Sequence, residues 1–161
     1  MKCIALGIDP GIANTGYAIV VRTATKFKVI ESGCIKTKAS DPTPHRLNTI
    51  FKAVSEVVYR HITDIDIIAI ECVFYNKNVS SAMHTAGVIG ILQLLAEQVQ
   101  IRSLTVTPQQ VKSAVGIAKA DKKQVQRLIY KLTGEKTITH HTADAIAAGI
   151  AGLLGKLAIE N

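Results

Sequence analysis

The stretch that decides the fold is Cys3–Ala18, which reads CIALGIDPGIANTGYA. Its first half is a short apolar run that ends in the acid Asp9, and a Pro-Gly turn signal follows at once. We expect a buried strand over residues 3–9, a turn that extends to residues 14–16, and a second strand over residues 17–21. A carboxylate at the end of a buried strand is costly unless a cation meets it. Asp9 is therefore a candidate metal ligand, although a purely structural Asp-Pro-Gly turn would read the same way.

The rest of the chain predicts one mixed α/β domain over residues 1–161. A third strand is expected over residues 26–35, with Phe27, Val29 and Ile35 alternating along it. Two more strands are expected, over residues 65–71 and 101–106. Five helices are expected, of which the second begins at Ser80 and the third at Pro108. Their ranges are 45–61, 80–98, 108 onward, 121–133 and 141–157. Three strands followed by alternating helices and strands predict an α/β fold with a five-stranded mixed sheet and helices on both faces.

Composition favours a basic, intracellular protein. Nineteen Lys and Arg residues stand against twelve Asp and Glu, for a net charge of +7, which suits a polyanionic partner such as nucleic acid or an acidic membrane surface. Three widely spaced cysteines without a CxxC pair predict reduced thiols; they are Cys3, Cys34 and Cys72. The first apolar run is too short for a signal peptide, and the uncharged segment 78–96 carries too many polar residues for a good membrane span. We therefore expect no membrane partner.

Further candidate ligands lie at two later element ends. Glu71 closes the apolar run Ile65–Ile70, and neighbouring strands can hold two such acids side by side. His141 and Asp144 open an apolar helix at positions i and i+3, on one helix face. Stabilisation of the helix N-terminus would explain Asp144, and surface exposure would explain His141. Brought together, however, three carboxylates and an imidazole predict a site for divalent cations.

These motifs, in this order, resemble the RuvC family of Holliday-junction resolvases, which have an RNase H-like fold. The resemblance covers nearly the whole chain and rests on five segments: the Gly7-to-Ala18 hairpin, Ala69-Ile70-Glu71 with Phe74, Thr107 to Lys112, Lys122 to Val125, and Asp144 to Ala147. It implies a dimeric, metal-dependent endonuclease that resolves four-way DNA junctions by symmetric nicking in recombination and repair.

The resemblance also implies which residues form the metal site. Asp9, Glu71 and Asp144 match three of the family's four metal-site positions, and His141 falls where many members carry Asp and some carry His. Two Mg²⁺ ions can activate water, relieve charge at the phosphate and stabilise the leaving oxygen. We predict that Asp9 bridges the ions while Glu71 and Asp144 hold one each and His141 completes the site. An imidazole is a softer ligand, so Mn²⁺ is expected to substitute for Mg²⁺; a proton-carrier role for His141 remains an alternative.

Contacts with junction DNA are predicted in two regions. The loop after Glu71 offers an aromatic residue for stacking on opened bases, and its candidates are Phe74, Tyr75 and Lys77. A basic segment offers phosphate contacts through Lys112, Lys119, Lys122, Lys123 and Arg127. A loop aromatic packed on its own core, or a merely solvated basic helix, would explain the same residues. The family resemblance further implies a homodimer through residues 80–98, a possible branch-migration complex as partner, and a cytoplasmic, nucleoid-associated location.

Three other functions fit parts of the pattern. A non-catalytic junction-binding scaffold would keep the fold while His141 marks a damaged site. A YqgF-like nuclease acting on RNA shares the fold, but its hairpin usually carries Arg where this chain has Thr15. An actin-like ATPase has a similar opening hairpin, but it needs two such domains and about twice this length.

Overall fold

A five-stranded mixed sheet in the order β3-β2-β1-β4-β5 forms the centre of the molecule. In chain order the elements are β1 (Cys3–Asp9), β2 (Asn14–Arg22), β3 (Phe27–Lys36), α1 (Thr43–Arg60), β4 (Ile67–Glu71), α2 (Val79–Gln98), β5 (Ser103–Val106), α3 (Pro108–Ala114) and α5 (His140–Glu160). The structure is a computed structural model that describes residues 2–24, 26–72, 79–114 and 139–160, the last five as backbone only, together with 124, 127, 129–131 and 134.

Strand pairing follows the order in which hairpins and crossovers occur along the chain. β1, β2 and β3 form an antiparallel meander, and β4 and β5 then add to the other side of β1 in parallel. The two parallel pairings require crossovers, and the long helices α1 and α2 provide them. The predicted mixed five-stranded sheet is thereby confirmed.

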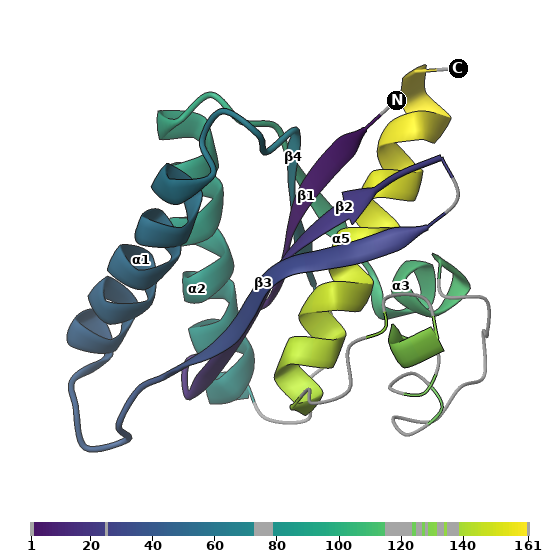
Figure 1. The fold of residues 1–161 in the computed structure, drawn as a ribbon. Coiled ribbons are helices and arrows are strands. Elements are labelled where there is room, and N and C mark those ends of the chain that lie inside the picture. Colours follow the sequence, from purple (N-terminus) through teal and green to yellow (C-terminus); the bar gives the residue numbers. More distant parts are fainter. Residues whose placement is uncertain are drawn as a thin grey trace.

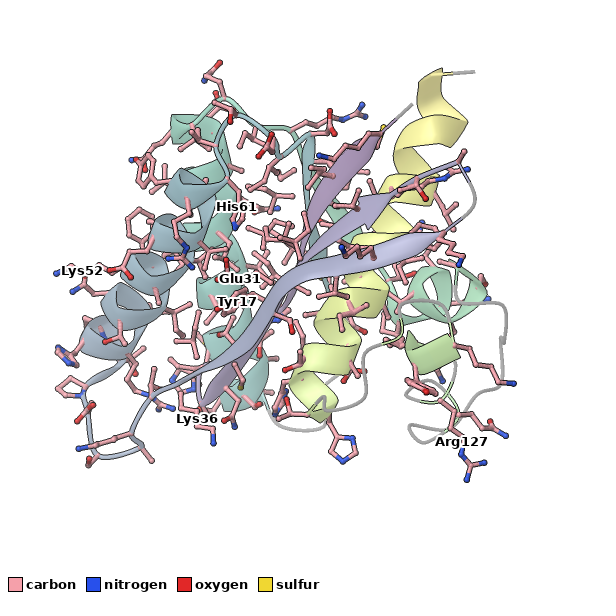
Figure 2. All side chains as sticks on the ribbon, viewed as in Figure 1. Tyr17, Glu31, Lys36, Lys52, His61 and Arg127 are labelled. Carbon is pink, nitrogen blue, oxygen red and sulfur yellow. The ribbon has the colours of Figure 1, made fainter. Side chains whose placement is uncertain are left out.

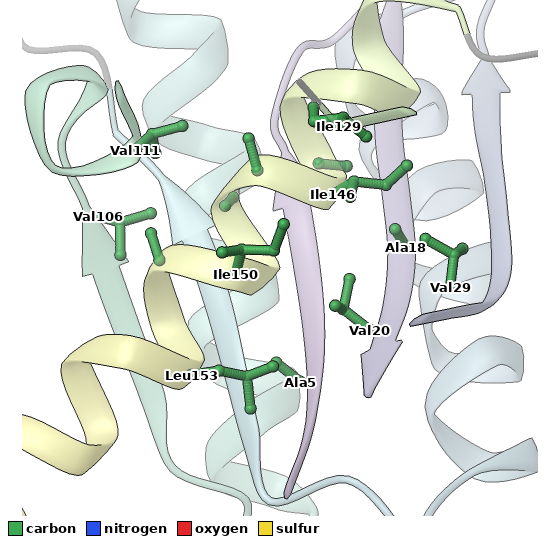
Figure 3. Packing of buried hydrophobic residues seen from close by; sticks show 14 of the residues in the cluster. Ala5, Ala18, Val20, Val29, Val106, Val111, Ile129, Ile146, Ile150 and Leu153 are labelled. Carbon is green, nitrogen blue, oxygen red and sulfur yellow. The ribbon is translucent and has the colours of Figure 1, made fainter. Parts of the chain in front are cut away.

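Helices cover both faces of the sheet, as expected (Figure 1). α1 and α2 lie on one face, where they bury an aliphatic cluster that includes Leu6, Ile8, Ile19 and Val54. α5 crosses the other face over a second cluster of Ala, Val and Ile residues (Figure 3). Alternate residues of each central strand enter the two clusters, because successive side chains of a strand point to opposite faces of the sheet. We call these two sides of the sheet the α1/α2 face and the α5 face.

The second strand, β2, begins three residues earlier than the sequence predicted. Residues 14–16, predicted as a turn, are part of β2 and pair with residues 34–36 of β3. Thr15 is fully buried there and its hydroxyl donates to the carbonyl of Gly11, so the turn closes within residues 10–13. Conversely, β5 begins at Ser103 rather than at residue 101, because the Ile101 amide donates back to the Ala96 carbonyl at the end of α2. The predicted helix over 121–133 lies mostly outside the described residues.

A β-bulge in β3 changes which of its side chains share a face. Val20 pairs with Val29, but the next residue back, Ile19, pairs with Glu31, so Ile30 is an extra residue without a partner in the register. Val29 therefore belongs to the α5-face cluster, whereas Ile35 packs on the α1/α2 face. The expectation that Phe27, Val29 and Ile35 share one alternation is wrong for this reason.

Polar contacts tie β3 to the end of α1. Glu31 accepts hydrogen bonds from the Tyr17 hydroxyl, from Arg60 and from the His61 ring (Figure 2). Partial burial raises the pKa of Glu31, but the hydrogen bonds from His61, Arg60 and Tyr17 and the charge of Arg60 outweigh that effect, so its pKa lies below the ordinary value. The edge strand is thus held to the helix by an ionised carboxylate.

Candidate active site

The predicted metal-site residues lie where β1 and β4 end and where α5 begins, at the lower end of the sheet in Figure 1. β1 and β4 are neighbouring parallel strands in which Ile8 pairs with Ile70, so Asp9 and Glu71 follow at the same level of the sheet. The residues two positions earlier, Gly7 and Ala69, both face α5. Because side chains alternate along a strand, Asp9 and Glu71 are also directed to the α5 face. The expectation of two acids side by side on neighbouring strands is confirmed.

Glycines let α5 lie almost against the backbone of β1 and β2. A Cβ atom at Gly7 would stand 2.1 Å from the carbonyl oxygen of Ala145, and one at Gly16 would stand 2.1 Å from that of His141. Separations this short are impossible for real side chains, so both positions need glycine for the helix to approach. These glycines therefore serve the packing of α5 against the sheet.

The start of α5 is fixed by its own polar contacts. The Thr139 hydroxyl accepts a hydrogen bond from the Thr142 amide at 3.2 Å and shares another with the Thr142 hydroxyl at 2.8 Å. This is the arrangement of an N-terminal cap, which satisfies one of the unpaired amides of the first turn. The cap and the contact at Gly16 together set where the first turn begins, and therefore where His141 and Asp144 stand.

His141 is in direct contact with Asp9. Its Nδ1 atom lies 2.8 Å from Oδ2 of Asp9, across 132 positions of sequence. The His141 side chain is 43% exposed and that of Asp9 only 19%, so the pair sits at the rim of the sheet with the imidazole toward solvent. Asp144 follows one helical turn later and is half-buried. The fold thus brings the first strand and the last helix together at one point.

The donor set fits a divalent cation in chemical kind. Carboxylate oxygens are the ligands that Mg²⁺ and Mn²⁺ take in proteins, and an imidazole shifts the preference toward softer transition metals. Within the described residues, no three His, Cys, Asp or Glu side chains already stand close enough to share an ion. The backbone positions are nevertheless close together, since Asp9 and Glu71 end neighbouring strands, and His141, near the start of α5, contacts Asp9.

The predicted DNA contacts are only partly within the described residues. Lys112 lies on α3 and is half-buried, and Arg127 is exposed (Figure 2). The helix α3 begins with a reciprocal cap, in which the Thr107 amide donates to the Gln110 side chain and the Gln110 amide to the Thr107 hydroxyl. The other six candidates lie outside the described residues; they are Phe74, Tyr75, Lys77, Lys119, Lys122 and Lys123.

Sequence reasoning missed the contribution of β3 to this edge. Asp9 pairs with Gly16 in β2, and Gly16 pairs with Cys34 in β3, so these three residues form one row across the sheet. Lys36 ends the same strand. Cys34 and Lys36 are two positions apart, so the sequence predicts that their side chains share one face of the strand. It could not predict which face, because the bulge at Ile30 changes the alternation before them.

Comparison with known proteins gives a consistent family assignment. A family model described as crossover junction endodeoxyribonuclease RuvC matches residues 5–152. A RuvC protein from Alkaliphilus metalliredigens is 40% identical over 91% of this chain and 90% of its own length, and one from Treponema denticola is 38% identical over 93% and 85%.

Solved structures agree with the sequence relatives. The structure of T. thermophilus RuvC in complex with a Holliday junction substrate matches with a TM-score of 0.85 and 27% identity over 92% of both chains. The yeast mitochondrial Holliday junction resolvase shares the fold at 15% identity, over 91% of this chain and 76% of its own, with a TM-score of 0.67. The opening hairpin, the two acids on adjacent strands and the last helix above them are thus features of a chain that belongs to the RuvC family of crossover junction endodeoxyribonucleases.

Proposed function

We propose that this protein is a structure-selective endonuclease that resolves four-way DNA junctions by metal-dependent hydrolytic nicking. The observation that supports the proposal is the contact of His141 with Asp9, together with the position of Glu71 at the same level of the neighbouring strand, in a chain of this family. The RuvC family is a family of divalent-metal-dependent nucleases. Which ion this chain prefers, and how many it binds, belongs to the proposal.

We infer that the four residues hold two Mg²⁺ ions, with Mn²⁺ able to substitute. When bound, two such ions supply an activated water, charge relief at the phosphate and stabilisation of the leaving oxygen. Asp9 is next to Glu71 in the register of neighbouring strands and in contact with His141, so it would be the ligand common to both ions. Glu71 and Asp144 would each hold one ion. His141, whose ring nitrogen is hydrogen-bonded to the Asp9 carboxylate, would orient that carboxylate and complete the ligand set.

The test is cleavage of a labelled mobile four-way junction, compared with linear duplex, in the presence of EDTA, Mg²⁺ or Mn²⁺. The protein should make paired, symmetric nicks on the junction alone, and only with a metal. Asp9→Asn and Asp144→Asn should abolish nicking while junction binding survives. The matched control is Asp64→Asn, the same charge change at an exposed residue between α1 and β4.

The same assay separates the other candidate functions. A junction-binding scaffold would bind the junction tightly and leave it uncut under either metal. An RNA-directed nuclease would cut an RNA substrate in preference to the DNA junction. Equal loss of binding and nicking in Asp9→Asn and Asp144→Asn would show that these residues are structural.

A homodimer through α2 is part of the proposal, because two equivalent sites are needed to nick two symmetric strands. α2 has one face on the sheet, where Val88, Leu92 and Leu95 are buried. Its other side exposes Val79 and Met83, which are 74% and 69% accessible. By length and composition α2 is a helix that could cross a membrane, and 22% of its apolar window is buried. Since one face already packs on the sheet, a second copy of the chain is the better partner for the exposed side.

Sedimentation tests the dimer directly. The protein should sediment as a dimer at micromolar concentration, and Met83→Glu should shift it toward monomer by placing a charge in the contact. Lys52→Glu on the exposed side of α1 is a matched control that should leave the dimer intact. A monomer at every concentration tested would argue against the pairing of sites. Association with a branch-migration complex and a nucleoid location in the cytoplasm remain further parts of this proposal.

A further inference from the structure

The end of β3 presents a cation on the same face as the metal-site residues. Because Ile35 packs on the α1/α2 face, its neighbours Cys34 and Lys36 are directed to the α5 face. Cys34 lies in the same row across the sheet as Asp9 and Gly16. Lys36 is two residues further along β3, where it pairs with Asn14 at the end of the sheet at which β1 finishes. Lys36 therefore shares both the face and the edge with Asp9.

The ammonium group of Lys36 is available to a ligand. Its side chain is exposed (Figure 2). Within the described part of the chain this side chain takes part in no hydrogen bond or ion pair. Its field also reaches the row of the metal site. Burial raises the pKa of the Cys34 thiol, while the charge of Lys36 lowers it and that of Asp9 raises it. One thiol thus lies within electrostatic reach of both the cation and the metal-site carboxylate.

The backbone around Lys36 is braced from the opposite face. The next residue, Thr37, donates its amide to the Ala13 carbonyl at 3.1 Å and its hydroxyl to the Ile12 carbonyl. The Nε atom of Arg46 donates to the same hydroxyl at 2.8 Å. Arg46 is only 9% exposed and has no carboxylate partner among the described residues. It therefore adds an uncompensated positive charge next to the end of β3, on the α1/α2 face of the sheet. The strand end is therefore held rigidly to the turn that follows Asp9.

A polyanionic strand that crosses three carboxylates needs cations on both sides of them. Lys112 lies on α3, which follows β5 on the side of β4 away from β1. β3 lies two strands from β1 on the other side, about 10 Å away at the usual spacing of strands. That distance corresponds to roughly three nucleotides at about 3.4 Å of axial rise each.

We propose that Lys36 binds a backbone phosphate of the junction strand a few nucleotides from the cut, on the β3 side of the metal site. The inference rests on the proposed junction-cleaving function and adds a contact to it. Lys36 positions the strand by charge and carries no information about base sequence. With Lys112 on the opposite side, it brackets the carboxylates with positive charge and offsets their repulsion of the strand.

The test uses the full-length protein and the salt dependence of junction binding in EDTA, between about 50 and 200 mM salt. One phosphate contact contributes about 0.9 to the slope of log affinity against log salt. Lys36→Ala should therefore make the slope shallower by about 0.9, and Lys36→Arg should restore it. The matched control is Lys28→Ala, an exposed lysine of the same strand at the end far from the site. It removes the same charge and should leave the slope unchanged.

Two results would overturn the inference, and they are distinguishable. Equal slopes for Lys36→Ala and Lys28→Ala, in a protein that nicks junctions with metal, would remove the contact at Lys36 and leave the function intact. Failure of the unsubstituted protein to bind and nick junctions would overturn the proposed function, and the contact with it. Melting temperatures serve as the folding check, since both lysines are exposed.

Discussion

Replacing Gly16 with alanine should separate two of the predicted metal-site residues, His141 and Asp9, without changing either of them. The new Cβ would lie 2.1 Å from the His141 carbonyl oxygen and 3.1 Å from its Cβ. The oxygen contact has to open to at least 3.0 Å, so the first turn of α5 must move by about 0.9 Å or the hairpin must yield by as much. Added to the present 2.8 Å between His141 and Asp9, that movement breaks their hydrogen bond.

The expected loss follows from this displacement. A misplacement of about 1 Å in a reacting assembly costs roughly 10²-fold in rate, so single-turnover nicking of a four-way junction should fall by about that factor. Overpacking of this kind costs about 1–3 kcal/mol, and each kcal/mol lowers the melting temperature of a chain of this size by about 2–4 °C. Nicking at saturating protein concentration and thermal unfolding measure the two effects separately.

Gly155→Ala is the matched control on the same helix. Its Cβ would stand 3.8 Å from Leu104, which is ordinary van der Waals contact, so the substitution should stabilise the helix by about 0.5–1 kcal/mol and leave nicking unchanged. If Gly16→Ala nicked at the unsubstituted rate and melted at the same temperature, the close approach of α5 would not be what positions the site.

Two further predictions concern Glu31 and His141. The pKa of Glu31 lies below its ordinary value of 4.5, so its stabilisation is present above that value and is lost as pH falls through the lower folded-state value. The gap in free energy of unfolding between the protein and Glu31→Gln should therefore shrink between about pH 5 and pH 3, and a constant gap in urea titrations would contradict this. His141→Asp replaces a nitrogen ligand by a hard oxygen ligand and should lower the ratio of Mn²⁺-supported to Mg²⁺-supported nicking rates; an unchanged ratio would place His141 outside the ligand set.

The order of elements could be predicted because apolar periodicity is a local property of the chain. The runs ending in Asp9 and Glu71 are short, continuous and aliphatic, and both form central strands as expected. The turn signal at residues 14–16 was misleading, because an Asn and a Gly can also serve a strand where a helix must pass close by. Local propensity cannot reveal that need, since the helix in question begins some 125 residues later.

The sequence predicted where the candidate residues lie in the fold but not the contacts that they make. Acids at strand ends and an imidazole at a helix start are visible in the sequence, and adjacent parallel strands then place two of the acids together. The His141–Asp9 contact depends on how deeply α5 settles onto Gly7 and Gly16, which is a matter of tertiary packing. Whether the four residues bind metal stays a prediction. Lys36 could not be assigned to the site, because one inserted residue at Ile30 reverses the face of every later side chain in β3.

That inserted residue also bears on whether the chain aggregates. β3 is ten residues long and forms one edge of the sheet, so its outer backbone groups could template the addition of a strand from another chain. The bulge breaks the regular spacing of those groups and increases the local twist, and the charged residues Lys28, Glu31 and Lys36 along the strand oppose regular stacking. Addition of a strand from another chain at the β3 edge is therefore disfavoured.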